Sequence, residues 1–259
     1  TAEYYAENCG SIQYGSDVVL YIGLSHYPRG TKTGEQIVGL EGLDMWDWSY
    51  TLFVLPDILK ALKITILATF LGFAMASILG LILAICRRSQ YKPLSMAVGA
   101  FVEFIRTTPL LAQLYFIFYV FPQFGLALSP LAAGVIGLGL HYSTYLSEVY
   151  RAGIDSIPQA QWEAATALSF STRHIWLKII LPQAIPPILP VMGNYLIGMF
   201  KDTPLLSAIT LVEILQVAKL QGSQYFRYLE PVTIVGLLFL ILSYVSSLGI
   251  KRLEARVNH

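Results

Sequence analysis

Charged residues are scarce in this sequence of 259 residues. Asp, Glu, Lys and Arg make up 13% of it, against roughly a quarter in an average soluble domain, and the formal net charge is +1. A chain so nearly neutral offers no basic field for nucleic acid, which excludes that class of partner. The two cysteines, Cys9 and Cys86, are too far apart to suggest a disulfide framework. No zinc-type Cys/His spacing is present, so no metal site is expected.

Apolar residues take the place of the missing charge. They make up 55% of the sequence, and the mean hydropathy is +0.60. Uncharged runs as long as those found here would leave a soluble fold with more apolar surface than it could bury. The economical interpretation is one all-α integral membrane domain.

The uncharged runs predict about five membrane-spanning helices. The first, Ile64–Ile85, is long enough to cross a hydrocarbon core and is expected to enter it near Pro56. Residues 107–147 contain no Lys, Arg, Asp or Glu, and the breakers FPQFG and LSP divide them into a second and a third span. The fourth span, Ile179–Phe200, begins irregularly because of its prolines, and the fifth is Pro231–Ile250.

Basic residues predict the orientation of these spans, because short cytoplasmic loops carry an excess of Lys and Arg. With five spans, three basic clusters fall on one side, and the loop 122–130 on the other side has no charge. The clusters are Arg87, Arg88 and Lys92; Arg151, Arg173 and Lys178; and Lys251, Arg252 and Arg256. The N-terminus is therefore expected outside the cell and the C-terminus in the cytoplasm.

Residues 1–44 differ from the rest of the chain. They are polar and rich in Gly, their one apolar run is Val18–Leu24, and they lack the charged start and long apolar core of a signal peptide. Met45 has the look of a natural start, and Trp46 and Trp48 suit a membrane interface. We expect residues 45–259 to form the membrane domain, and residues 1–44 to be either an external N-terminal extension or an artefact upstream of it.

The segment QWEAATALSFSTRHIWLKIILPQA, residues 161–184, is unlike the spans on either side of it. Glu163 suits the positive end of a first short helix, and Ser171 or Thr172 can cap a second one that ends toward Pro182. Large apolar side chains on this charged segment indicate either a docking surface for a partner or a helix lying among lipid headgroups. These side chains are Trp162, Phe170 and Trp176.

A fixed spacing within this segment is more specific than the two helices. Glu-Ala-Ala is followed after three residues by a small residue, and after nine more by Ile-x-Leu-Pro. The positions are held by Glu163, Ala164, Ala165, Ser169, Ile179, Leu181 and Pro182. This pattern resembles the cytoplasmic signature loop of ATP-binding-cassette (ABC) import permeases, which usually have Gly where Ser169 stands; Ser also tolerates turns. The resemblance implies a type I ABC importer permease fold with this segment as its coupling helix.

Other stretches from Met45 onward extend the resemblance. EFIRTTPLLAQLYFIFY, which begins at Glu103, and YLSEVYRAGIDSIPQAQWEAA, which begins at Tyr145, are similar to segments of permeases for polar amino acids. GNYLIGMFKDTPLLSAIT and FRYLEP resemble the permease subunits for ectoine and hydroxyectoine, a closely related branch. The implied substrate is a small zwitterion.

The resemblance also implies partners. No phosphate-binding GxxxxGK[ST] occurs in the sequence, so a separate ATPase subunit must bind ATP and its Mg, and this chain needs no cofactor and has no catalytic residues. An extracytoplasmic solute-binding protein would deliver the substrate. Five spans are too few to enclose a path, so a second permease subunit, identical or homologous, is expected beside this one in the bacterial cytoplasmic (inner) membrane.

Several polar residues within the spans are candidates for the substrate path. Lys201 and Asp202 end the fourth span, where they either line the path or form an ordinary helix end at the outer interface. Tyr142 and Tyr145 belong to a polar cluster that either packs helices together or lines a cavity. Three residues separate Glu103 from Arg106, which favours a structural pair over substrate contact.

Two other classes of membrane protein compete with this interpretation. A channel or secondary transporter would work without ATP, but such folds often carry internal repeats, and no convincing repeat is visible here. A membrane enzyme needs a cluster of His or carboxylates, and the few polar residues within the spans supply none.

Overall fold

The computed structural model describes residues 9–14, 18–23 and 46–257 of the chain. The chain divides into two units, Thr1–Met45 and Trp46–His259, which are described separately. In the first unit, β1 (Cys9–Tyr14) and β2 (Val18–Gly23) pair antiparallel, with Cys9 opposite Gly23 and Tyr14 opposite Val18. The remainder of the predicted extension 1–44 lies outside the described residues, so its origin stays a prediction.

Every regular element in the described residues of the second unit is a helix, which confirms the predicted fold class. Its elements are α2 (Trp48–Arg87), α3 (Lys92–Thr107), α4 (Leu110–Tyr115), η2 (Phe116–Val120), η3 (Phe121–Phe124), α5 (Pro130–Asp155), α6 (Gln159–Ala167), α7 (Thr172–His174), η4 (Ile175–Ile180), α8 (Leu181–Asp202), η5 (Thr203–Ile209), α9 (Ile214–Tyr225) and α10 (Leu229–Val257).

Helix α2 is longer than the first predicted span. Its N-cap is Asp47, whose carboxylate accepts hydrogen bonds from the backbone N–H of Ser49 and Tyr50 at 2.8 and 3.1 Å. The helix then continues for 40 residues, passing through Pro56. At 1.5 Å per residue this is roughly 60 Å, about twice the thickness of a hydrocarbon core. The helix therefore extends well beyond the predicted start near Pro56.

Helices α2 and α5 run in the same direction and approach closely. Every fourth residue of α2 from Ala68 to Ala84 is small and buried. A Cβ atom added to Gly80 would lie 2.8 Å from the carbonyl oxygen of Ser143, which is backbone and cannot move aside cheaply. Such small-residue seams let helix backbones come together in a bilayer, where apolar burial gives helices little reason to associate. The small residues of the seam are Ala68, Gly72, Ala76, Gly80 and Ala84.

The chain bends sharply where the second predicted span begins. Helix α3 ends at Thr107, and the stretch Leu110–Phe124 leaves it at 102°. The break falls at Pro109, which lacks a backbone N–H and disfavours a helical conformation at Thr108. The Gln113 side chain closes the corner, because its Nε2 donates to the carbonyl oxygen of Ile105 at 2.8 Å.

Among the described residues, three helices are long and apolar enough to cross a membrane, and four if the bent pair is one span. The three are Trp48–Arg87, Thr172–Ile209 and Leu229–Ala255. The third predicted span corresponds to α5, which has 26 residues but is less apolar because of the polar stretch 141–145. The count of five spans stays a prediction.

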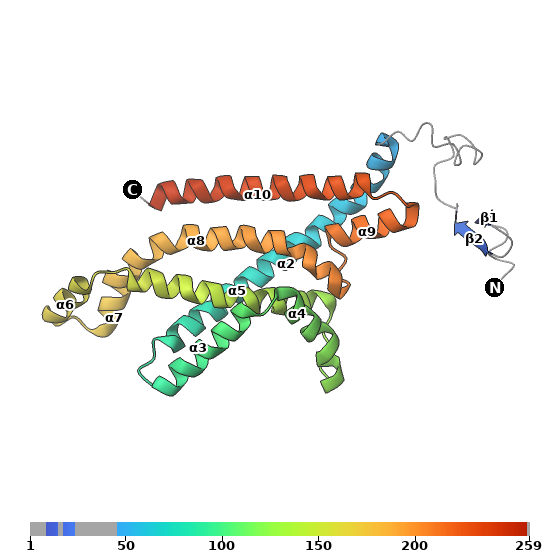
Figure 1. Cartoon of the computed structure of the whole chain (residues 1–259). Coiled ribbons are helices and arrows are strands. Elements are labelled where there is room, and N and C mark those ends of the chain that lie inside the picture. The colour runs from blue at the N-terminus through green and yellow to red at the C-terminus, as the bar shows by residue number, and fades with distance from the viewer. Residues whose placement is uncertain (1–8, 15–17, 24–45, 258–259) are drawn as a thin grey trace. The chain divides into compact units, whose positions relative to one another are not determined.

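Helix α8 packs against α5 in the opposite direction, with Ile188 beside Gly153 near one end and Gly198 beside Tyr142 near the other. Four of its first ten residues are proline: Pro182, Pro186, Pro187 and Pro190. Figure 1 shows α6 and α7 at one end of these helices and α9 at the other. The C-terminal end of α10 lies at the α6 and α7 end, so the three basic clusters share one end of the unit. Which side of the membrane that end faces stays a prediction.

Candidate functional site

A cavity of about 490 Å³ lies between α5 and α8 and contains three of the four predicted path residues. Tyr142 and Tyr145 come from α5, and Asp202 is the last residue of α8. The other lining residues are His141, Val191, Asn194, Tyr195 and Gly198. The polar side chains predicted from two separate spans therefore meet at one place.

Asp202 is the carboxylate of this cavity. The Tyr142 hydroxyl donates a hydrogen bond to its Oδ2 at 2.7 Å, and the Tyr142 side chain is otherwise buried between the helices. Asp202 itself is half-buried. The hydrogen bond holds the carboxylate at the cavity wall, where it presents negative charge to whatever enters.

Aromatic rings surround the carboxylate. The Tyr195 ring centroid lies 5.7 Å from that of Tyr145 and 6.3 Å from that of Tyr142. The Arg106 guanidinium lies 5.3 Å from the Tyr145 ring centroid, and His141 Nδ1 is 3.2 Å from Gln113 Oε1. Ring faces attract cations, so a carboxylate among three tyrosines suits a cationic group. No group of three or more metal-binding side chains occurs in the part of the chain that the structure describes.

Lys201, the fourth predicted path residue, does not line the cavity, and its side chain is exposed. Neighbouring residues of a helix point about 100° apart, and here the Asp202 side chain faces the cavity while that of Lys201 faces away from it. Tyr195 and Asn194 were not predicted. The sequence spacing could have indicated them, because Tyr195, Gly198 and Asp202 recur at helical spacing and so share one face of α8.

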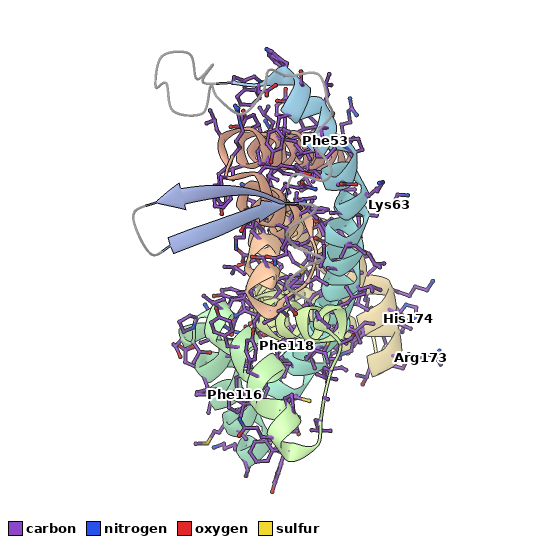
Figure 2. The ribbon with its side chains drawn as sticks, turned by 90° about the vertical axis from the view of Figure 1, so that its right-hand side faces the viewer. Phe53, Lys63, Phe116, Phe118, Arg173 and His174 are labelled. Atoms are coloured by element: carbon purple, nitrogen blue, oxygen red, sulfur yellow. The ribbon has the colours of Figure 1, made fainter. Side chains whose placement is uncertain are left out.

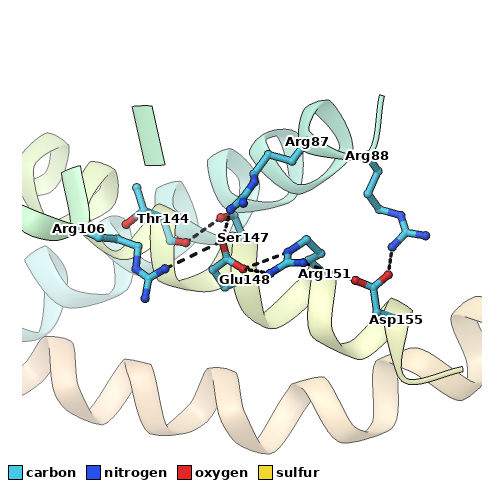
Figure 3. Close-up of polar contacts among 8 residues, drawn as sticks. All are labelled: Arg87, Arg88, Arg106, Thr144, Ser147, Glu148, Arg151 and Asp155. Atoms are coloured by element: carbon cyan, nitrogen blue, oxygen red, sulfur yellow. Dashed lines mark hydrogen bonds and ion pairs between the residues drawn. The ribbon is translucent and has the colours of Figure 1, made fainter. Parts of the chain in front are cut away.

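The predicted pair of Glu103 and Arg106 is wrong. Arg106 Nη1 lies 4.0 Å from Glu148 Oε1, and Glu103 is exposed with no ion pair to Arg106. Glu148 also accepts hydrogen bonds from Arg87 of α2 and, at 2.6 Å, from Arg151 of α5 (Figure 3). One carboxylate thus joins α2, α3 and α5. Spacing along a single helix could not reveal a centre formed by three.

The predicted coupling residues lie at the end of the unit where α5 meets α8. We call 159–182 the coupling segment; Figure 2 shows Arg173 and His174 on it, pointing away from the bundle. Glu163 and Ala164 are exposed on α6, and Pro182 is exposed at the start of α8. Ile179 and Leu181 are half-buried.

Ala165 differs from its neighbours, because it is only 2% exposed. It packs in a cluster with Ile154, Ile175 and Ile180, so it holds the coupling segment together rather than offering a surface. The large apolar side chains expected to form a docking surface also contact other residues of the segment. Trp162 and Trp176 contact each other edge to face at 5.1 Å, whereas Phe170 stacks on His174.

Ser169 makes the turn that ends α6. Its φ of 56° is in the left-handed region. Its N–H donates to Thr166 at 2.9 Å and that of Phe170 to Ala165 at 3.2 Å, the paired bonds of a Schellman motif. The position is one where Gly is favoured, and Ser occupies it without a change in the turn.

Residues 76–259 match the family described as "Binding-protein-dependent transport system inner membrane component". A "probable amino-acid ABC transporter permease protein" of Sinorhizobium fredii is 40% identical over 209 residues, which cover 81% of this chain and 90% of that protein. The L-cystine transport system permease of Bacillus subtilis is 35% identical over 207 residues, 78% of this chain and 88% of that protein. A crystal structure of an amino acid ABC transporter with histidines is 32% identical, covers 82% of this chain and 99% of that one, and superposes with a TM-score of 0.77.

The Ser169→Gly variant should be more stable by about 1 kcal/mol. A left-handed conformation costs a residue with a Cβ about 1–2 kcal/mol, and Gly avoids this strain. Part of the gain in stability is lost again, because Gly has more conformational entropy to lose on folding. The midpoint of thermal unfolding in detergent measures the effect. Ser156→Gly is the control: Ser156 is also exposed at a helix end but has a φ of −71°, so the same change there should lower the midpoint. A lower midpoint for Ser169→Gly would contradict the strained turn.

Proposed function

The chain belongs to the family of binding-protein-dependent transport system inner membrane components, as a permease subunit of an amino-acid ABC importer, and on this premise we propose that its α5–α8 cavity is half of a path for a small zwitterion. The observation that carries the proposal is the half-buried carboxylate of Asp202 among Tyr142, Tyr145 and Tyr195. This arrangement attracts the ammonium end of an amino acid through charge and ring faces together.

The negative end of a zwitterion also has a partner near the cavity. The Arg106 guanidinium lies over the Tyr145 ring and is only loosely paired with Glu148, at 4.0 Å. Its side chain is 36% exposed. A substrate with its ammonium at Asp202 would therefore have a cation available for its carboxylate. A negative charge in the cavity and a positive charge beside its Tyr145 wall favour zwitterions over ions of a single sign.

The cavity opens on one side of α5 and α8 rather than being enclosed by the described helices. A second permease subunit, identical or homologous, would close it. An extracytoplasmic solute-binding protein would deliver the substrate, and ATPase subunits would bind ATP and Mg. The homologues support an ATPase and a binding protein as partners in general; the second permease is part of our proposal.

The coupling segment would transmit the ATPase motion. Glu163 and Ala164 are exposed and available for docking, and the buried Ala165 joins them to the cluster of Ile154 and Ile188 on α5 and α8. Displacement of the segment would then move the helices that form the cavity, which is the requirement for alternating access.

The narrower substrate in our proposal is ectoine or hydroxyectoine. Their amidinium cation is delocalised and suits aromatic faces better than a compact ammonium does. The stretches GNYLIGMFKDTPLLSAIT and FRYLEP support this branch by resemblance, whereas the named relatives above are amino-acid permeases.

Asp202→Asn should slow substrate uptake by the reconstituted transporter roughly tenfold or more, because it removes a charge-assisted hydrogen bond to the cationic group. Uptake into proteoliposomes containing all subunits and the binding protein measures this. Lys201→Gln is the matched control, since Lys201 is adjacent in sequence but exposed outside the cavity, and its uptake should be unchanged. Equal uptake by Asp202→Asn and wild type would show that the cavity is not part of the substrate path.

Glu163→Lys should uncouple ATP hydrolysis from transport, because it reverses the charge of an exposed residue on the surface proposed to meet the ATPase. Uptake should fall while the basal ATPase rate of the complex is kept. The control Gln161→Lys places a positive charge about 200° away around the same helix and should have a smaller effect. Normal substrate-stimulated ATPase activity and uptake in Glu163→Lys would count against this docking surface.

The substrate itself is best identified through the binding protein. Calorimetric titration of that protein with ectoine, hydroxyectoine and the common amino acids should show the tightest binding for an ectoine. Tight binding of amino acids with none of ectoines would overturn the narrower proposal and leave the zwitterion path standing. Tight binding of solutes that lack either a cationic or an anionic group, with none of ectoines or amino acids, would contradict both.

A further inference from the structure

A second, larger cavity lies beside the coupling segment. Its volume is about 950 Å³, and it is bounded by the end of α2, the end of α5, η4 and the proline-rich half of α8. Its wall is almost entirely apolar, and several of its side chains are also exposed on the outer surface of helices long and apolar enough to cross a membrane. Among them are Leu81, Ile85, Ile185 and Leu189.

A polar cavity of about 390 Å³ adjoins this apolar one. It is lined by Arg88, Asp155, Gln159 and Trp162 among others. The two cavities share three lining residues, Arg88, Ile154 and Trp176, so they adjoin each other at the point where α2 ends. Together they form a site with a long apolar part and a charged part at its mouth.

We propose that this composite site binds one membrane phospholipid whose headgroup carries a primary ammonium. An acyl chain occupies the apolar cavity, the headgroup phosphate binds Arg88, and the ammonium binds Asp155. The binding of the lipid does not depend on the transport function proposed above. The effect of the lipid on coupling rests on that proposed function.

The apolar part favours an acyl chain as its occupant. An apolar cavity that stays empty forfeits dispersion contacts along its whole lining. Leu81 and Ile185, each almost half exposed, lie on helices that cross the hydrocarbon, so acyl chains are the abundant apolar groups beside the opening. A water-soluble ligand would have to leave water for a wall that offers it almost no polar partner.

The charged part favours a headgroup with both signs of charge. Arg88 and Asp155 form an ion pair with each other, yet their side chains are 33% and 47% exposed (Figure 3). Each can therefore turn to a headgroup group of opposite charge, and Arg151, 3.7 Å from Asp155, limits the loss when their own pair opens. A headgroup with phosphate but no cation would instead leave Asp155 with only Arg151, at 3.7 Å, as its counter-ion and would place its own negative charge beside that carboxylate, which disfavours it.

The site reaches the coupling segment directly. Trp162 of α6 and Trp176 of η4 line the polar cavity and contact each other. A bound headgroup thus lies against both helical parts of the segment, and the chain of the same lipid lies against α8. If the segment transmits ATPase motion as proposed, the bound lipid restricts the movement of the segment relative to the membrane helices.

Native mass spectrometry of the complete transporter, extracted from membranes and exchanged with defined lipids, tests the proposal. The probes are dioleoyl phosphatidylethanolamine and dioleoyl phosphatidylglycerol. Wild type should retain one phosphatidylethanolamine in preference to phosphatidylglycerol. Leu189→Trp, which places a bulky ring in the wall of the apolar cavity, and Arg88→Gln, which removes the phosphate ligand, should each weaken this binding roughly tenfold. Asp155→Asn should abolish the preference while phosphatidylglycerol still binds.

Two matched controls should leave lipid retention unchanged. Leu237→Trp adds the same bulk to an exposed position of α10 outside both cavities, and Lys92→Gln removes an exposed basic residue that lines neither. Equal retention of the two lipids by wild type would overturn the headgroup assignment. Undiminished phosphatidylethanolamine binding by Leu189→Trp, or a change in the number of permease copies in place of a lipid, would overturn the site.

Discussion

The close contact of α2 with α5 is the interaction on which the rest of this structure depends. In a bilayer, helices gain little from hiding apolar surface, so close packing and polar contacts must hold them together. The small-residue seam allows α2 to lie against the backbone of α5 at Ser143. The same approach brings Arg87 and Arg88 to Glu148 and Asp155. It also fixes the polar face of α5, which supplies two tyrosines to the cavity.

Much of the fold was predictable because each long apolar run forms its own helix. The fourth and fifth predicted spans begin and end within two residues of α8 and α10, except that α10 continues past Ile250 to Val257. Contacts that need several helices were not predictable. The bend at Pro109 was missed because an uncharged run shows length but not direction, and Arg106 was paired along its own helix because Glu148 is 42 residues away in sequence.

The two ends of α8 contact different parts of the unit. Its first half contacts the coupling segment through Ala184 and Ile188, and its last turns carry Tyr195 and Asp202 to the cavity. Asp202 of the predicted path and the predicted coupling residues are thus parts of one helix and its flanking segment, which the sequence could show only as two unrelated patterns. Ala165 illustrates the limit of pattern matching, because a signature position says nothing about which way its side chain faces.

The four prolines of α8 have a mechanical consequence. A proline cannot donate the hydrogen bond that ties one helical turn to the previous one, so the first half of α8 resists bending less than the second. A force applied at the coupling segment would be taken up as curvature near Pro186 and Pro187. The half beyond Pro190 would swing as a rigid arm. Such bending would change the direction in which the Tyr195 and Asp202 side chains point without changing the spacing between them.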